Sequence, residues 1–98
     1  MIKTKSIIQT DREHCYICGK NKYFEPIDEH HVYAGANRQL SEKYGLKVYL
    51  HHWTCHLYGV HKDGELGDRL KADVQRKAME HYGWTVDDFI SIFGKSYI

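Results

Sequence analysis

Hydrophobic residues in the last third of the chain recur at helical spacing. Steps of four residues separate Leu66, Leu70 and Val74, and Met79 roughly continues the same face toward Gly83. Residues four apart lie on one side of an α-helix, so this spacing predicts an amphipathic helix whose apolar side is buried. Gly83 is the residue type that commonly ends such a helix.

A second helix is predicted close to the end of the chain. Thr85 and Asp88 have the spacing of a capping box, with Asp in place of the usual Glu. The apolar residues Phe89, Ile90 and Phe93 follow, and Gly94 is the expected end of the helix. We assign these two helices to the core and give them no chemical role.

Shorter elements are predicted in the front of the chain. In chain order, we expect a strand at Ser6–Gln9, a tight turn at Cys15–Gly19, a loop at 21–26, a strand at 29–33, a helix at Arg38–Tyr44 ended by Gly45, a strand at Leu46–Leu50 and a short helix capped by Thr54. The fold class is therefore α+β. With no repeat or linker, we predict a single domain over residues 1–98, with a core at 15–61 and a helical tail at 62–98.

Composition narrows the function classes. The 98 residues carry 14 Lys and Arg against 13 Asp and Glu, so a contact with nucleic acid has to be local rather than spread over a basic surface. No apolar run approaches the ~18 residues of a membrane span. The first residues lack a secretory signal, and three cysteines do not form a disulfide framework. We therefore expect a cytoplasmic protein.

Histidine and cysteine are concentrated in the front of the chain. Seven of the eight histidines and all three cysteines lie between His14 and His61. Cys15 and Cys18 are two residues apart before a glycine, the spacing of a zinc knuckle. The alternatives are a redox pair and two thiols with no shared role, but redox pairs usually open a helix after a strand in a larger α/β fold. We favour structural zinc, with Cys55 as the third ligand.

The fourth zinc ligand has several candidates. His52 is favoured, because the gap from His52 to Cys55 repeats the gap of the knuckle. His51 competes from one residue away, on the opposite side if the strand continues. In a third interpretation both histidines are surface residues, and water or His14 completes the site.

A second group of histidines suggests a different metal site. On a strand, His30 and His31 point to opposite faces, so one can bind a metal while the other stays free as a base. His30, His56 and His61 could hold a divalent cation with open positions for phosphate and water, as in a phosphodiesterase. Residues five apart differ by about 140° on an α-helix, so His56 and His61 cannot share its face. We expect Gly59 to end the helix and let His61 turn back.

These residues together resemble a known family. Cys15-x-x-Cys18, His30-His31-Val32, Cys55-His56 and a following His61 resemble the HNH endonucleases, also called ββα-metal or His-Me finger nucleases. Further segments resemble short HNH-type chains of phages and prophages: Glu29–His31, Asn37-Arg38, Ser41–Leu46 and Ile92–Lys95.

The resemblance implies a fold and roles for individual residues. It implies a zinc-stabilised ββα-metal core that hydrolyses DNA in the cytoplasm of a bacterial host, with phage proteins as possible partners. The residue roles that it implies are His31 as general base, His30, His56 and His61 as ligands of a catalytic Mg²⁺, Mn²⁺, Ni²⁺ or Zn²⁺, and Cys15, Cys18 and Cys55 as zinc ligands.

The sequence departs from the family pattern at two places. A histidine stands where the family has its fourth zinc cysteine. The family's middle asparagine, which orients the base, is missing from its usual place, and Asn37 is the candidate replacement. A non-catalytic zinc module of HNH shape that binds DNA or a protein is therefore the alternative function, with an unrelated zinc protein as the remaining interpretation.

Overall fold

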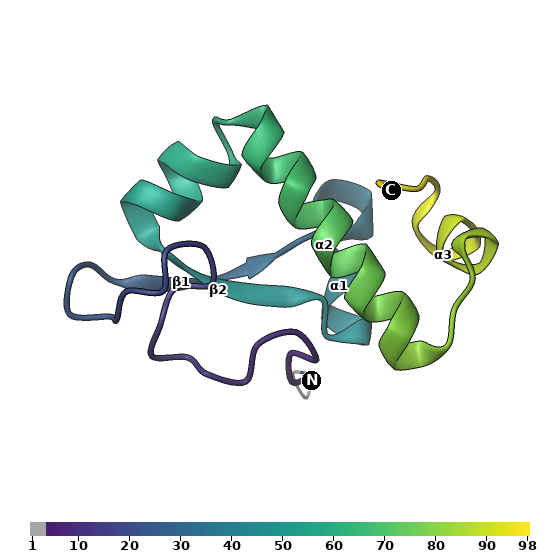
Figure 1. Ribbon diagram of the computed structural model, residues 1–98, viewed down its shortest axis with the longest axis horizontal. Helices are drawn as coiled ribbons and strands as arrows, with labels where there is room; N and C mark the ends of the chain where they lie inside the picture. Colours follow the sequence, from purple (N-terminus) through teal and green to yellow (C-terminus); the bar gives the residue numbers. More distant parts are fainter. Residues whose placement is uncertain (1–3) are drawn as a thin grey trace.

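The computed structural model describes residues 4–98 (Figure 1). Its elements, in chain order, are β1 (Ile27–His31), a 3₁₀ turn (Gly35–Asn37), α1 (Arg38–Tyr44), β2 (Lys47–His51), a π-helix (His52–Val60), α2 (Gly64–Tyr82) and α3 (Val86–Phe93). The protein is a small mixed α/β structure with a two-stranded sheet. No helix within residues 4–98 has the length and apolar character needed to cross a membrane.

The hairpin of β1 and β2 is the scaffold for the histidines. The strands pair in antiparallel register, with Ile27 opposite His51 and His31 opposite Lys47. Helix α1 connects them and ends at Gly45, which has a left-handed φ of 71°. A side chain at Gly45 would collide with the carbonyl oxygen of Lys5, so glycine is needed here for two reasons. The predicted strand–helix–strand order is confirmed, with strand bounds shifted by one or two residues.

The N-terminal segment does not form the strand predicted at Ser6–Gln9. The Ser6 hydroxyl accepts hydrogen bonds from the N–H groups of Ile8 and Gln9, at 3.1 and 3.0 Å, and donates one to the Lys47 carbonyl at 2.5 Å. Such local side-chain bonds compete with regular strand pairing. The segment instead covers β2, where the Gln9 side chain accepts from the Tyr49 N–H at 2.8 Å. All five residues of β2 are consequently buried, although its sequence alternates between apolar and polar.

The two tail helices follow their predicted boundaries. The Asp63 carboxylate caps α2 by accepting from two N–H groups, and Gly83 ends it with a φ of 70°. The capping box of Thr85 and Asp88 is present with both of its hydrogen bonds. In Figure 1, α2 runs diagonally past the hairpin, and α3 lies to the right of α2. One buried cluster joins the two helices to the hairpin: Val32, Tyr33, Leu46, Val48, Leu50, Leu70, Val74, Ala78, Phe89 and Phe93.

The segment after β2 is a π-helix, and two predictions about it are wrong. The helix begins at His52 rather than after Thr54, because the Glu25 carboxylate accepts from the N–H groups of Trp53 and Thr54, both at 2.9 Å. It also continues through Gly59 to Val60. A Cβ at Gly59 would lie 3.1 Å from the Thr54 carbonyl oxygen, five residues earlier. The close approach of successive turns explains the glycine inside the helix.

Candidate metal centres

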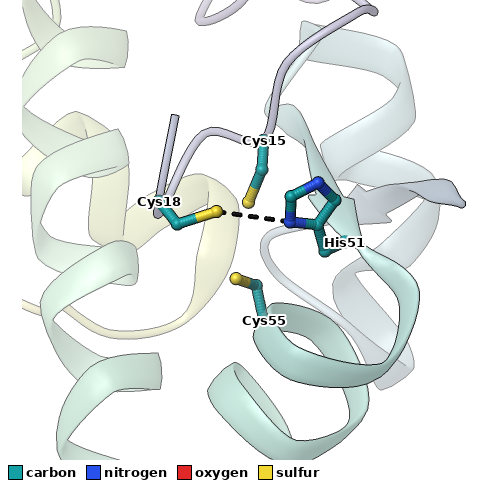
Figure 2. A group of neighbouring side chains, drawn as sticks. All are labelled: Cys15, Cys18, His51 and Cys55. Carbon is teal, nitrogen blue, oxygen red and sulfur yellow. Dashed lines mark hydrogen bonds between the residues drawn. The ribbon is translucent and has the colours of Figure 1, made fainter. Parts of the chain in front are cut away.

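Three cysteines and one histidine form the first cluster (Figure 2). One ligand atom from each of Cys15, Cys18, His51 and Cys55 lies within 4.8 Å of all the others. The Cys18 Sγ and His51 Nδ1 atoms are 3.2 Å apart. Tetrahedral zinc binds sulfur at about 2.3 Å and nitrogen at about 2.0 Å, so its ligand atoms lie roughly 3.5–3.8 Å from one another. The cluster therefore fits a structural metal such as zinc.

The cluster joins two segments that are distant in sequence. Cys15 and Cys18 lie on a turn closed by a 2.9 Å hydrogen bond from the Gly19 N–H to the Cys15 carbonyl. His51 ends β2, and Cys55 follows in the first turn of the π-helix. All four side chains point toward a common centre in Figure 2. Cys15, His51 and Cys55 are buried, so this centre is closed on most sides.

His51 occupies the position that the sequence assigned to His52. His51 Nε2 donates to the Asn21 carbonyl at 2.9 Å, which leaves the lone pair on Nδ1 facing the sulfur atoms. His52 turns away, and its Nδ1 lies 2.5 Å from Asp28 Oδ2. The end of β2 decides the matter, because His51 is the last residue of the strand and His52 is the first residue of the π-helix. His14 is also outside the cluster and pairs with Asp11 at 2.6 Å.

The thiols of the first cluster have opposite tendencies to ionise. Burial raises the pKa of the Cys15 thiol, but backbone N–H groups, including those of Cys18 and His51, outweigh it and lower the pKa on balance. Burial together with the neighbouring Cys15 and Cys18 thiols raises the pKa of Cys55 to about 12. A cation at the centre would favour thiolates throughout, because coordinated thiols are deprotonated.

Three histidines form the second cluster. His30, His56 and His61 each offer one ring nitrogen, and these atoms lie within 4.8 Å of one another. The Nε2 atoms of His56 and His61 are 3.0 Å apart. The three rings line a cavity of about 180 Å³, together with Glu29, His31, Ala34 and Arg38. The structure thus brings together the three histidines selected from the sequence as metal ligands.

The π-helix explains how His56 and His61 share one face. The His61 N–H donates to the His56 carbonyl at 3.2 Å, the i to i+5 bond that defines this helix type. Residues five apart therefore lie one above the other, as residues four apart do on an α-helix. The expectation that Gly59 ends the helix is wrong, because the helix continues to Val60. His61 therefore meets His56 without a reversal of the chain.

Burial favours the neutral form of two histidines in the second cluster, His30 and His61. Loss of solvent, followed by the nearby charges of His56 and His61, lowers the pKa of His30 to about 3. Partial loss of solvent, followed by the nearby charge of His56, also lowers the pKa of His61, whose side chain is otherwise exposed. A neutral imidazole has a free lone pair on one ring nitrogen, which is the form that binds a metal.

His31 lies beside a carboxylate rather than beside Asn37. Its Nε2 is 3.2 Å from Oε1 of Glu42, on α1, and the other oxygen of Glu42 is 2.8 Å from the buried Nζ of Lys47. Lys47 Nζ also lies 3.4 Å from Glu29. Burial raises the pKa of Glu42, but the hydrogen bonds from Lys47 and His31 outweigh it and lower the pKa to about 2.

The prediction that Asn37 orients His31 does not match the structure. The Asn37 side chain donates to the Phe93 carbonyl at 2.9 Å and so holds the tail against the turn before α1. Sequence reasoning missed Glu42, because it looked for the amide of the family pattern. The signal in the sequence was Glu42 itself, an acidic residue on the helix predicted soon after the strand that carries His31.

Asp28 contacts two histidines at once. Its Oδ2 atom is 2.9 Å from Nδ1 of His56 and 2.5 Å from Nδ1 of His52. Partial burial opposes the charge, but the hydrogen bonds from His56 and His52 outweigh it and hold the pKa of Asp28 below its usual range. Asp28 is therefore a carboxylate near neutral pH. No sequence argument had selected it.

Comparison of the chain with protein-family models, with curated proteins and with solved structures gives no match.

Proposed function

We propose that this protein is a metal-dependent endonuclease of the HNH type, which hydrolyses phosphodiester bonds in DNA. The observation that carries the proposal is the convergence of His30, His56 and His61 on a cavity that His31 also lines. The resemblance to phage and prophage chains further suggests a phage-encoded enzyme that acts in a bacterial host and has phage proteins as partners.

The donor set fits a catalytic divalent cation. Three imidazole ligands leave other positions of the cation open, which distinguishes a reactive metal site from a structural one. A bound Mg²⁺, Mn²⁺, Ni²⁺ or Zn²⁺ would offset the negative charge of the phosphate and of the departing 3′ oxygen. Arg38, at the wall of the same cavity, adds a positive charge that can hold a phosphate oxygen.

His31 is the general base in this proposal. The Glu42 carboxylate accepts from Nε2–H, so the lone pair of the neutral ring is on Nδ1. Within residues 4–98, Nδ1 has no hydrogen-bond partner, which leaves it free to take a proton from water. The water oxygen then forms a bond to phosphorus as the bond to the 3′ oxygen breaks. Glu42, itself held by Lys47, stabilises the charged imidazole.

A non-catalytic zinc module that binds DNA or a protein is the second candidate. The observation in its favour is that Asn37 holds the tail instead of orienting His31. The cysteine-rich cluster would then be the functional part, and the three histidines would be a remnant of a catalytic centre.

Plasmid cleavage separates these candidates. We expect the wild type to cut DNA with at least one of Mg²⁺, Mn²⁺, Ni²⁺ and Zn²⁺. His31→Ala should cut about 10²–10⁴-fold more slowly, because it lacks the general base, while it still binds metal and DNA. His81→Ala is the matched control, since His81 lies in the last turn of α2 and outside both clusters.

Two results would contradict the proposed nuclease function. Equal cleavage by the wild type and His31→Ala, in preparations free of other nucleases, would exclude His31 as the base. Absence of cleavage with all four metals, combined with DNA or protein binding, would favour the zinc module.

A further inference from the structure

We infer that Asp28 is a positioning residue of the three-histidine centre, and that its carboxylate holds His56 in the one tautomer able to bind a metal through Nε2. The inference rests on the proposed function, because it assigns a partner to one ligand of the proposed catalytic metal. It also gives a role to His52, which is not a ligand of the cysteine-rich cluster.

The two ring nitrogens of His56 have different surroundings. Nδ1 lies 2.9 Å from a carboxylate oxygen of Asp28, and Nε2 lies 3.0 Å from Nε2 of His61. A carboxylate only accepts hydrogen bonds, so the single hydrogen of the neutral ring lies on Nδ1. The lone pair of Nε2 is then directed to the side where the other two histidines converge. A carboxylate hydrogen-bonded to a ligating histidine also makes that ligand more basic.

The strand places Asp28 and His30 together. They are two residues apart on β1, so both side chains project from the same face of the hairpin. One strand thus supplies a proposed metal ligand and the anchor of another ligand. Asp28 pairs with Leu50 in the sheet, two residues before the start of the π-helix that carries His56.

His52 holds the carboxylate from the other side. Its Nδ1 donates to the same Asp28 oxygen at 2.5 Å, from the first residue of the π-helix. His52 and His56 are four residues apart on this helix, so Asp28 bridges its first turn. The contact fixes the helix against β1 as well as fixing the ring of His56. The side chain of Asp28 is only partly buried, with 30% of its surface exposed, so an isosteric amide fits without a cavity.

The test compares Asp28→Asn with Asp11→Asn in the full chain with its zinc site filled. Asp11 is the matched control, because it forms a 2.6 Å pair with His14 that touches neither cluster. Ni²⁺ affinity is measured by titration calorimetry, and a chromogenic chelator reports any zinc released from the cysteines. We expect Asp28→Asn to bind Ni²⁺ about 10–100-fold more weakly, and Asp11→Asn to match the wild type.

A spectroscopic measurement tests the tautomer directly. In the zinc-loaded protein without Ni²⁺, ¹⁵N NMR should show the hydrogen of His56 on Nδ1 in the wild type and on both nitrogens in Asp28→Asn. A purely structural role of Asp28 would leave this signature unchanged. Zinc content and far-ultraviolet circular dichroism verify that each variant is folded.

Several outcomes would overturn the inference. Equal Ni²⁺ affinity and an unchanged tautomer in Asp28→Asn would exclude positioning by the carboxylate. Loss of one bound Ni²⁺ per chain, instead of weaker binding, would make Asp28 a ligand in its own right, with His52 and His56. If the wild type binds no Ni²⁺ at the histidines, the proposed function fails, and the NMR signature still decides the role of Asp28.

Discussion

The two candidate metal centres share one segment of chain and differ in almost every other respect. Cys55 and His56 are neighbours on the π-helix, yet one belongs to the cysteine-rich cluster and the other to the histidine cluster. The first has four donors, three of them buried, and the second has three donors beside a cavity. Four donors complete a tetrahedral site, whereas three leave room for water or a substrate. One helix can therefore serve a closed centre and an open centre at once.

Donor chemistry increases the contrast. Thiolates bind zinc tightly and suit a metal that is kept for the life of the protein. Neutral imidazoles accept several divalent metals, which suits a site where the ion also has to contact a phosphate. We therefore expect removal of the first metal to affect folding, and removal of the second to affect function.

The largest effect is expected from removing a ligand of the cysteine-rich cluster, the closed centre. Cys15→Ser should lose zinc and unfold the front of the protein, because structural zinc contributes on the order of 10 kcal/mol in small domains. His61→Ala, in the open centre, should change the free energy of unfolding by about 1 kcal/mol or less, since its side chain is exposed. Zinc analysis and thermal unfolding of both variants measure the difference. Similar losses of stability in the two variants would remove the distinction between the centres.

A smaller effect is expected from the tail, which belongs to neither centre. Leu70→Ala should lower the free energy of unfolding by about 2–5 kcal/mol, because this side chain is 5% exposed and packs in the core. Ile90→Ala is the control, with 38% of its surface exposed on α3. Urea denaturation gives the stabilities, and calorimetry should show unchanged Ni²⁺ affinity. Weaker Ni²⁺ binding by folded Leu70→Ala would mean that the tail shapes the open centre.

The smallest effect concerns the acidic residue beside the proposed base. The pKa of Glu42 is lowered from 4.5 to about 2 on folding, so its contribution is complete above pH 4.5 and is lost as the pH falls toward 2. Solvent reaches 23% of the side chain, and we expect Glu42→Gln to cost about 1–3 kcal/mol at pH 6.

The pH dependence of this cost is measured as a difference. Unfolding of the wild type and Glu42→Gln is followed at each pH, and zinc content is measured in parallel so that only samples that keep their zinc are compared. The gap between them should narrow below pH 4.5. A constant gap would mean that Glu42 acts through its shape and not through its charge.

The regular parts of the fold were accessible from the sequence because local signals determine them. The capping box at Thr85, the four-residue steps of α2 and the stop at Gly45 each involve residues close together in the chain. The strand expected at Ser6–Gln9 does not form, because its backbone is held by the Ser6 hydroxyl and by contacts with β2. Those contacts depend on tertiary structure.

The sequence predicts the metal-binding residues of the site better than it predicts their hydrogen-bond partners. The three clustered cysteines and the three convergent histidines follow from motif order, since each donor type has a characteristic spacing. The choice between His51 and His52 depended on where β2 ends, and spacing favoured the wrong one. Glu42 and Asp28 reach His31 and His56 from other elements, and no spacing rule links them.

The π-helix also shows how a helix can accommodate a change in length. A residue added to an α-helix rotates everything after it and would separate two side chains that share a face. When the surrounding turns take up π hydrogen bonding, the added residue is absorbed and a pair four apart becomes a pair five apart on the same face. His56 and His61 have this relation, and Gly59 between them lets the wider turns pack. The distance between two histidines in a sequence therefore does not by itself tell whether they meet, because the helix type can compensate for a single insertion or deletion.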